Sequence, residues 1–134
     1  MKKILIAGMI ATVFLSSCKD EFNLPEYDSY IDGDAPTFDL LFPSIDTLID
    51  YQDSISFNII CRDNYALDSF FFEMQPDDLS ADLISYKTAV NDSVYTFNNR
   101  IALPKAEPTR YEVYVRAIDA VGNSNNKVYF FSTK

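Results

Sequence analysis

The chain has 134 residues, 20 of them acidic and 11 basic, and a formal net charge of −9. It contains no His, which excludes His-based catalytic triads and zinc sites with His ligands. The acidic balance also argues against nucleic acid as a partner, because binding to phosphate backbones needs clustered Lys and Arg.

The first 17 residues have the features of a signal peptide. Lys2 and Lys3 form a positive start, and an apolar run of 12 residues follows over 4–15. This run is shorter than the ~20 residues that span a hydrocarbon core, so an uncleaved membrane anchor is disfavoured, and an ordinary secretory signal is the other alternative. The segment that ends the run, Leu15-Ser16-Ser17-Cys18, resembles the lipobox of bacterial lipoproteins. That resemblance implies cleavage before Cys18 and acylation of its thiol.

Acylation at Cys18 predicts where the mature protein resides. Several acyl chains on one residue give stable membrane attachment. The next residues, Lys19-Asp20-Glu21, resemble the export signal that sends lipoproteins of Bacteroidota to the outer face of the outer membrane. We therefore expect a lipid-anchored protein of the outer membrane, exposed at the cell surface. The short motif leaves open which leaflet holds the lipid.

Residues 18–35 are expected to form a flexible tether, and residues 36–134 a single folded domain. The tether contains Pro25, Gly33 and several acidic residues without a sustained hydrophobic period. Cys61 is the one cysteine left after acylation of Cys18, so the domain has no disulfide framework. Without His as a partner, Cys61 is expected to be a buried core thiol, and an intermolecular or redox role is the alternative.

From residue 36 onward, short runs rich in Phe, Tyr, Val and Ile alternate with Asp, Asn, Pro and Gly, as is typical of strands joined by tight turns. In the clearest case Ile55, Phe57, Ile59 and Cys61 alternate with polar residues. Residues 76–79 are expected to start one turn of helix. The predicted strands are residues 37–42, 54–62, 67–75, 84–90, 94–103, 110–119 and 126–133. Seven short strands at this spacing predict an all-β sandwich of two sheets.

The segment from Pro108 to Asn123, with Leu103-Pro104 before it, resembles strand F of fibronectin type III and bacterial Ig-like domains. The resemblance implies a seven-stranded Ig-like β-sandwich in which Tyr111 forms a corner through its hydroxyl. It also implies that Val113, Val115 and Ala117 fill the core. Residues 62–69 look like the Asp-containing corner between the second and third strands of such domains. Because the chain has no Trp, the broader bacterial Ig-like class fits better than true fibronectin type III modules.

Acidic and amide residues are predicted to gather at one end of the sandwich. They lie in three corners and in the segment that leads into the first strand: Asp63, Asn64, Asn91, Asp92, Asp119, Asn123, Asp32 and Asp34. Oxygen ligands from several loops can hold Ca²⁺, and Asp63 and Asp119 are the candidates. Turn formation is the favoured explanation, because Asp and Asn accept backbone hydrogen bonds in tight corners. We expect no metal and no other cofactor.

Strand parity predicts an aromatic patch on one outer surface. In the predicted strand 67–75, Phe71 faces outward if Phe70 and Phe72 face the core. In the predicted strand 110–119, Tyr114 faces outward if Val113 and Val115 face the core. If Val128 and Phe130 face the core, Tyr129 and Phe131 face outward as well. The candidate binding face is therefore Phe71, Tyr114, Tyr129 and Phe131. Contiguous exposed aromatic patches usually mark an interface.

These expectations favour a non-catalytic binding or assembly module at the cell surface. A small domain offers little concavity for an enzyme cleft. A protein partner is favoured for the aromatic patch, and the tether, a second copy of the chain or a glycan are the alternatives. A glycan ligand would make the protein an accessory lipoprotein of a polysaccharide-uptake system. The sequence leaves the ligand and the oligomeric state open.

Overall fold

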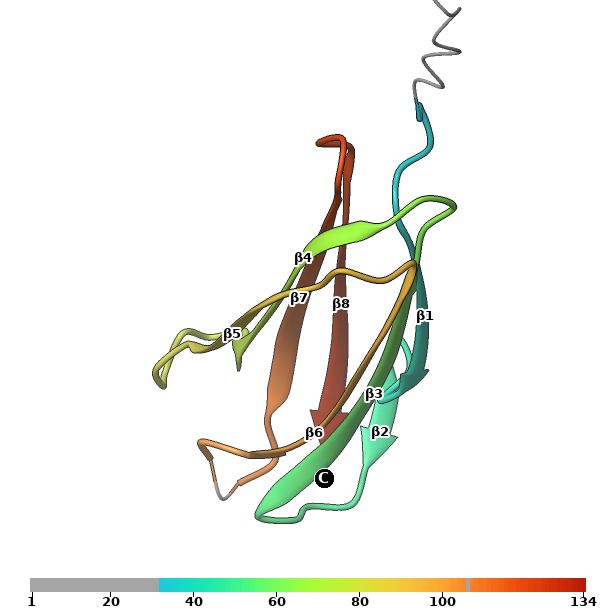
Figure 1. The fold of residues 1–134 in the computed structure, drawn as a ribbon. Helices are drawn as coiled ribbons and strands as arrows, with labels where there is room; N and C mark the ends of the chain where they lie inside the picture. The colour runs from blue at the N-terminus through green and yellow to red at the C-terminus, as the bar shows by residue number, and fades with distance from the viewer. Residues whose placement is uncertain (1–31, 106) are drawn as a thin grey trace, which may run out of the picture. The chain divides into compact units, whose positions relative to one another are not determined.

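The computed structural model describes residues 32–105 and 107–134 of the chain. The predicted signal peptide, Cys18 and the first part of the predicted tether lie outside the described residues. All regular structure in the described part is β (Figure 1). The strands are β1 (Thr37–Phe42), β2 (Thr47–Ile49), β3 (Ser54–Arg62), β4 (Leu67–Pro76), β5 (Ile84–Ala89), β6 (Val94–Ala102), β7 (Arg110–Asp119) and β8 (Ser124–Thr133).

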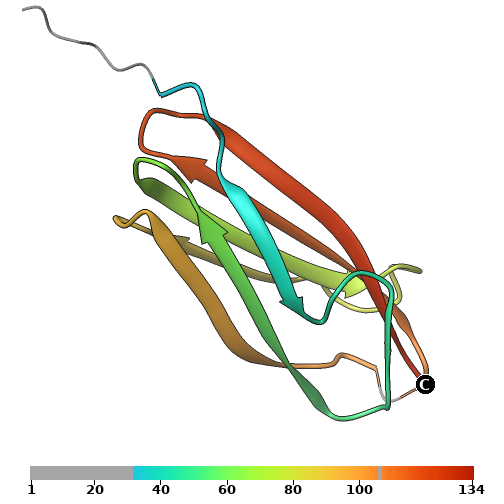
Figure 2. The same cartoon turned by 90° about the vertical axis from the view of Figure 1, so that its right-hand side faces the viewer.

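The strands form two sheets that pack face to face as a sandwich (Figure 2). One sheet has three strands in the order β1-β3-β6, and the other has five in the order β2-β8-β7-β4-β5. Neighbouring strands are antiparallel except β2 and β8, which are parallel. The described chain starts at one end of the sandwich, and its C-terminus lies at the other end (Figure 1).

All seven predicted strands are present, but the predicted number is wrong, because the described residues contain eight strands. The missed strand is β2, whose three residues are too few to show an alternating pattern. It pairs in parallel with the last residues of β8, from Thr47 beside Phe131 to Ile49 beside Thr133. Only this tertiary pairing makes the segment a strand.

The predicted helical turn after β4 is also wrong. Residues 77 and 78 form a hydrogen-bonded turn, in which the Leu79 N–H donates to the Pro76 carbonyl at 3.0 Å. Leu79 follows with a φ of 56°, which leaves the right-handed helical region. The Asp77 N–H donates instead to the Arg110 carbonyl of the neighbouring strand β7 at 3.0 Å. Pairing between β4 and β7 therefore continues into the turn and prevents a helix from starting.

The core lies between the sheets and is rich in aromatic rings. On β3 the inward residues are those that the alternation predicts, and Phe57 lies edge-on to Phe72 of β4, with centroids 4.9 Å apart. Phe72 in turn stacks on Phe97 of β6 at 4.7 Å. Cys61 is fully buried, as expected, and burial raises the pKa of its thiol to about 12. This thiol is therefore protonated and unreactive in the folded protein.

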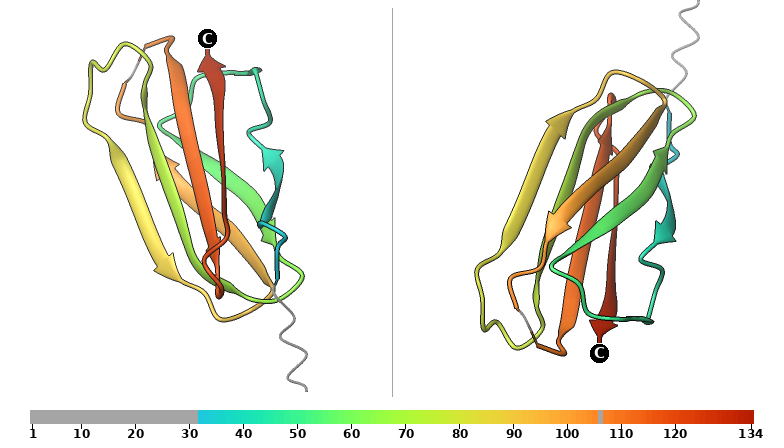
Figure 3. Two further views of the ribbon diagram at one scale, coloured as in Figure 1. Left: turned by 90° about the horizontal axis from the view of Figure 1, so that it is seen from above. Right: turned by 90° about the horizontal axis from the view of Figure 1, so that it is seen from below.

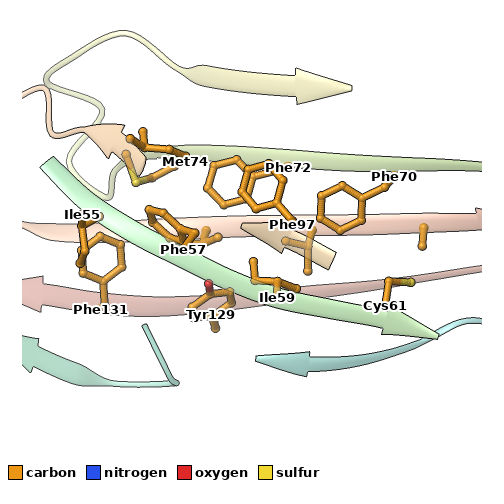
Figure 4. Close-up of a cluster of buried hydrophobic side chains, with 14 of the residues drawn as sticks. Ile55, Phe57, Ile59, Cys61, Phe70, Phe72, Met74, Phe97, Tyr129 and Phe131 are labelled. Carbon is orange, nitrogen blue, oxygen red and sulfur yellow. The ribbon is translucent and has the colours of Figure 1, made fainter. Parts of the chain in front are cut away.

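The predicted orientation of β8 is wrong: Tyr129 and Phe131 face the core and are 2% and 1% exposed. Figure 4 shows both rings in the core with Phe57 and Ile59. The cause is the register with β7, in which Val113 lies opposite Tyr129 and Tyr111 opposite Phe131. Partners in antiparallel strands share a face of the sheet, and the inward face of β7 is settled by its own alternation.

Candidate functional site

The outer surface of the five-stranded sheet carries a row of apolar and aromatic side chains, which we call the aromatic face. It consists of Phe71 on β4, Tyr114 on β7, and Val128 and Phe130 on β8. Val128 is 53% exposed, and the three rings are half-buried. Tyr114 lies beside Val128 in the register, so the patch runs across adjacent strands.

Two rings of the aromatic face lie under cations. The Lys87 Nζ lies 4.9 Å from the centroid of the Phe71 ring, and the Arg110 guanidinium carbon lies 4.1 Å from that of Phe130. Arg110 also pairs with Asp77 at 3.7 Å. Cations over ring faces are attracted by the negative face of the ring quadrupole. The aromatic face is therefore amphipathic, with charges held against its apolar surface.

The structure keeps half of the predicted binding face. Phe71 and Tyr114 point outward, as the alternation on their strands predicts. Tyr129 and Phe131 are core residues, and their neighbours Val128 and Phe130 take their place on the surface. A patch still exists at the predicted position, because both parities of β8 present apolar side chains.

The predicted gathering of acidic corners at one end of the sandwich is also present. The β3–β4, β5–β6 and β7–β8 turns come together there with the start of the described chain (Figure 3). Backbone hydrogen bonds join the turns: the Asp63 N–H donates to the Ser93 carbonyl at 2.9 Å, and the Ala120 N–H to the Ala66 carbonyl at 2.8 Å. We call this end the acidic pole.

Three carboxylates converge at the acidic pole. One oxygen each from Asp32, Asp63 and Asp119 lies within 4.8 Å of the other two. Asp32 and Asp119 are 3% and 1% exposed. Asp32 precedes β1, Asp63 follows β3 and Asp119 ends β7, so the fold brings together three distant parts of the sequence.

Turn hydrogen bonds account for part of this cluster. Asp119 Oδ1 accepts from the N–H groups of Val121 and Asn123, at 2.9 and 2.7 Å. Asp63 Oδ1 accepts from the Tyr65 N–H at 2.9 Å. The Asn123 amide donates to Asp119 Oδ2 at 2.7 Å and to the Asp32 carbonyl at 2.9 Å. These bonds are the turn chemistry that the sequence favours.

Two carboxylate oxygens of the cluster accept no hydrogen bond from the described residues. Asp32 Oδ1 accepts from the Asp34 N–H at 3.1 Å and from the Asn64 amide at 3.0 Å. Asp32 Oδ2 and Asp63 Oδ2 are buried and have no hydrogen-bond partner among the described residues. Burial, together with the charges of Asp32, Asp119 and Asp34, raises the pKa of Asp63 despite the hydrogen bond from Tyr65. Turn hydrogen bonds among the described residues thus leave two buried carboxylate oxygens without a partner.

The other predicted acidic residues lie at the pole without joining the cluster. Asp34 is exposed, and its carbonyl accepts from the Asn123 amide at 3.2 Å. Asn91 and Asp92 are exposed as well, and the Asp92 carbonyl accepts from the Leu67 N–H at 2.9 Å. The burial of Asp32 could not be read from its local sequence, because it depends on contacts with turns far along the chain.

Tyr111, the expected corner tyrosine, is fully buried, and its ring stacks on Phe131 with centroids 5.1 Å apart. Its hydroxyl makes no hydrogen bond of good geometry among residues 32–105 and 107–134. Burial raises the pKa of Tyr111, although the Thr109 side chain and the Lys105 backbone lie close enough to the hydroxyl to offset part of this rise. The residue therefore serves the core as expected, while the corner hydrogen bond stays a prediction.

Comparison with known proteins supplies no family. No family model matches the chain. No curated protein matches it either. Any statement of function therefore rests on the residues themselves.

Within residues 32–105 and 107–134, no helix has the length and apolar character needed to cross a membrane.

Proposed function

We propose that this chain is a surface lipoprotein with one Ig-like domain that acts as a non-catalytic binding or assembly module. The aromatic face carries this proposal. An outward row of Phe71, Tyr114, Val128 and Phe130 on adjacent strands is costly to leave in water and is typical of an interface. Two cations held on the rings supply the mixed apolar and charged character of non-obligate protein interfaces.

The proposed location rests on sequence features before the described residues. Leu15-Ser16-Ser17-Cys18 supports acylation at Cys18, and Lys19-Asp20-Glu21 supports export to the outer face of the outer membrane. Removing residues 1–17 leaves 9 basic residues against 20 acidic ones, a net charge of −11. A strongly acidic module is repelled by anionic lipid, which would keep the domain away from the membrane surface.

A protein partner fits the aromatic face better than a glycan does. Sugars bind aromatic residues by stacking on an open ring face, whereas Lys87 and Arg110 lie over Phe71 and Phe130. A partner with carboxylates could pair with these cations while its apolar residues cover Tyr114 and Val128. The proposed partner is therefore a protein surface that combines apolar and acidic groups.

The test compares the two outer surfaces of the sandwich in the acylated protein on intact cells. Surface cross-linking and purification would be done with wild type, with Phe71→Ser/Tyr114→Ser, and with the control Thr96→Ala/Asn98→Ala on the opposite sheet. We expect the partner to be lost only from the aromatic-face variant, because buried aromatic anchors carry most interface energy. Equal recovery with all three proteins would contradict the proposal. Binding to purified polysaccharide that Tyr114→Ser abolishes would favour the glycan alternative.

The anchor is tested by Cys18→Ala. The variant should appear in the soluble fraction or remain unprocessed, and it should not incorporate a labelled fatty acid. A correctly processed Cys18→Ala protein that stays in the membrane would contradict the lipoprotein assignment.

A further inference from the structure

We propose that the acidic pole is a calcium site, with Asp32, Asp63 and Asp119 as its carboxylate ligands. The convergence of three carboxylates is joined by a second observation: the Asp32 side chain is almost completely buried, and its Oδ2 has no partner among the described residues. Asp63 Oδ2 is buried without a partner in the same way. Unpaired buried carboxylate oxygens cost free energy, which a bound cation would recover.

Among residues 32–105 and 107–134, no Lys or Arg forms an ion pair with Asp32, Asp63 or Asp119. Arg62 and Asp63 line the same hollow of about 410 Å³. The Arg62 guanidinium pairs with Asp39 at 3.3 Å. A cation from solvent would therefore supply the counter-charge that the described residues do not.

The donor set selects a hard divalent cation. All three side chains offer oxygen, and neither His nor Cys belongs to the cluster, so soft metals are disfavoured. Ligand oxygens around one Ca²⁺ lie about 2.3 to 2.6 Å from it, so two of them can be about 5 Å apart. Separations within 4.8 Å fit that geometry. Mg²⁺ binds at about 2.0 to 2.1 Å and demands near-octahedral geometry, which three carboxylates fixed by turns do not readily provide.

The hollow beside the cluster leaves room for the remaining ligands. It is lined in part by Asp34, Asp63 and Asn64 and opens to solvent, so waters can complete the six to eight oxygens that Ca²⁺ takes. Binding would tie Asp32, at the start of the described chain, to the β3–β4 and β7–β8 turns. The ion would thereby fix the point where the predicted tether meets the domain.

The experiment is calcium titration of the full-length mature protein in detergent, by isothermal calorimetry and by thermal unfolding. We expect saturable binding of one Ca²⁺ per chain and an unfolding midpoint that rises with calcium and falls in EDTA. Mg²⁺ at the same concentration, and NaCl at the same ionic strength, should give smaller shifts. Equal shifts with all three salts would indicate charge screening and overturn the proposal.

The matched variants are Asp63→Asn in the cluster and Asp82→Asn, an exposed residue elsewhere in the chain. Asp63→Asn keeps an oxygen for the Tyr65 N–H and should weaken calcium binding at least tenfold, whereas Asp82→Asn should leave it unchanged. Asp32→Asn is the second cluster variant, and circular dichroism in EDTA checks the fold of each. Absence of saturable calcium binding to the wild type would overturn the site. So would a calcium affinity of Asp63→Asn and Asp32→Asn equal to that of the wild type.

Discussion

The outward faces of the two sheets are built from different kinds of residue. On the three-stranded sheet the outward positions of β3 and β6 are mainly small and polar, among them Ser54, Ser56, Thr96 and Asn98. On the five-stranded sheet the corresponding positions hold the aromatic face together with charged residues such as Glu73, Glu112 and Arg116. Both inner faces are apolar, so the core alone does not explain why one outer face has rings. The difference supports the proposal that the five-stranded sheet carries a contact surface.

The largest expected effect tests which side chains of β8 belong to that surface. Tyr129→Ser should destabilise the domain by about 3 to 5 kcal/mol, because it removes a buried ring and leaves a cavity. Val128→Ser, one residue earlier and 53% exposed, should cost less than about 1 kcal/mol. Urea denaturation of both variants measures the difference. Similar losses would mean that β8 does not separate an inner from an outer face.

The second prediction has the opposite sign at the same position. Burial raises the pKa of Tyr129, and its hydroxyl has no hydrogen-bond partner among the described residues. Tyr129→Phe keeps the ring and removes a desolvated polar group, so it should stabilise the domain by at most about 3 kcal/mol. The denaturation midpoint should rise. A clear fall would reveal a hydrogen bond to this hydroxyl and show that the ring is held by more than packing.

How far the sequence predicts this fold depends on the contrast between the two sides of each strand. On β3, β4 and β7 one side is more apolar than the other, so strand bounds and inward residues follow from alternation. On β8, residues 128–131 are all apolar or aromatic, so either side of the strand could face the core. Pairing with β7 decides between them, and that information lies in another part of the chain.

The candidate sites show the same division. The sequence predicts that Asp63 and Asp119 share one end, because alternate turns of a sandwich fall at the same end. The burial of Asp32 required the path of the chain before β1, which no local pattern specifies. The sequence also predicts an apolar patch on this sheet, but it assigns the wrong residues of β8 to it, because the outward side of β8 depends on its register with β7.

The third prediction sharpens the contrast between a ring on the surface and a ring in the core. Tyr114 is half-buried on the outside of β7, between Glu73 of β4 and Val128 of β8. Tyr114→Ser should lower the free energy of unfolding by about 1 kcal/mol, because only part of the Tyr114 ring is buried. Thermal unfolding beside Tyr129→Ser gives the comparison. A loss as large as that of Tyr129→Ser would place Tyr114 in the core and remove it from the aromatic face.

The smallest expected effect concerns the cations that lie over the rings. Arg110 is half-exposed, and its guanidinium carbon lies 4.1 Å from the centroid of Phe130. Arg110→Gln removes this contact and the ion pair with Asp77, and should cost about 0.5 to 1 kcal/mol. The control is Lys134→Gln, which removes only an exposed pair with Asp50. Raising the salt concentration weakens the ion pairs in both cases, so a difference between the two variants that persists in high salt reports the ring contact. If the difference disappears in salt, Arg110 acts on the aromatic face through charge alone, and Phe130 is open to a ligand that stacks on it.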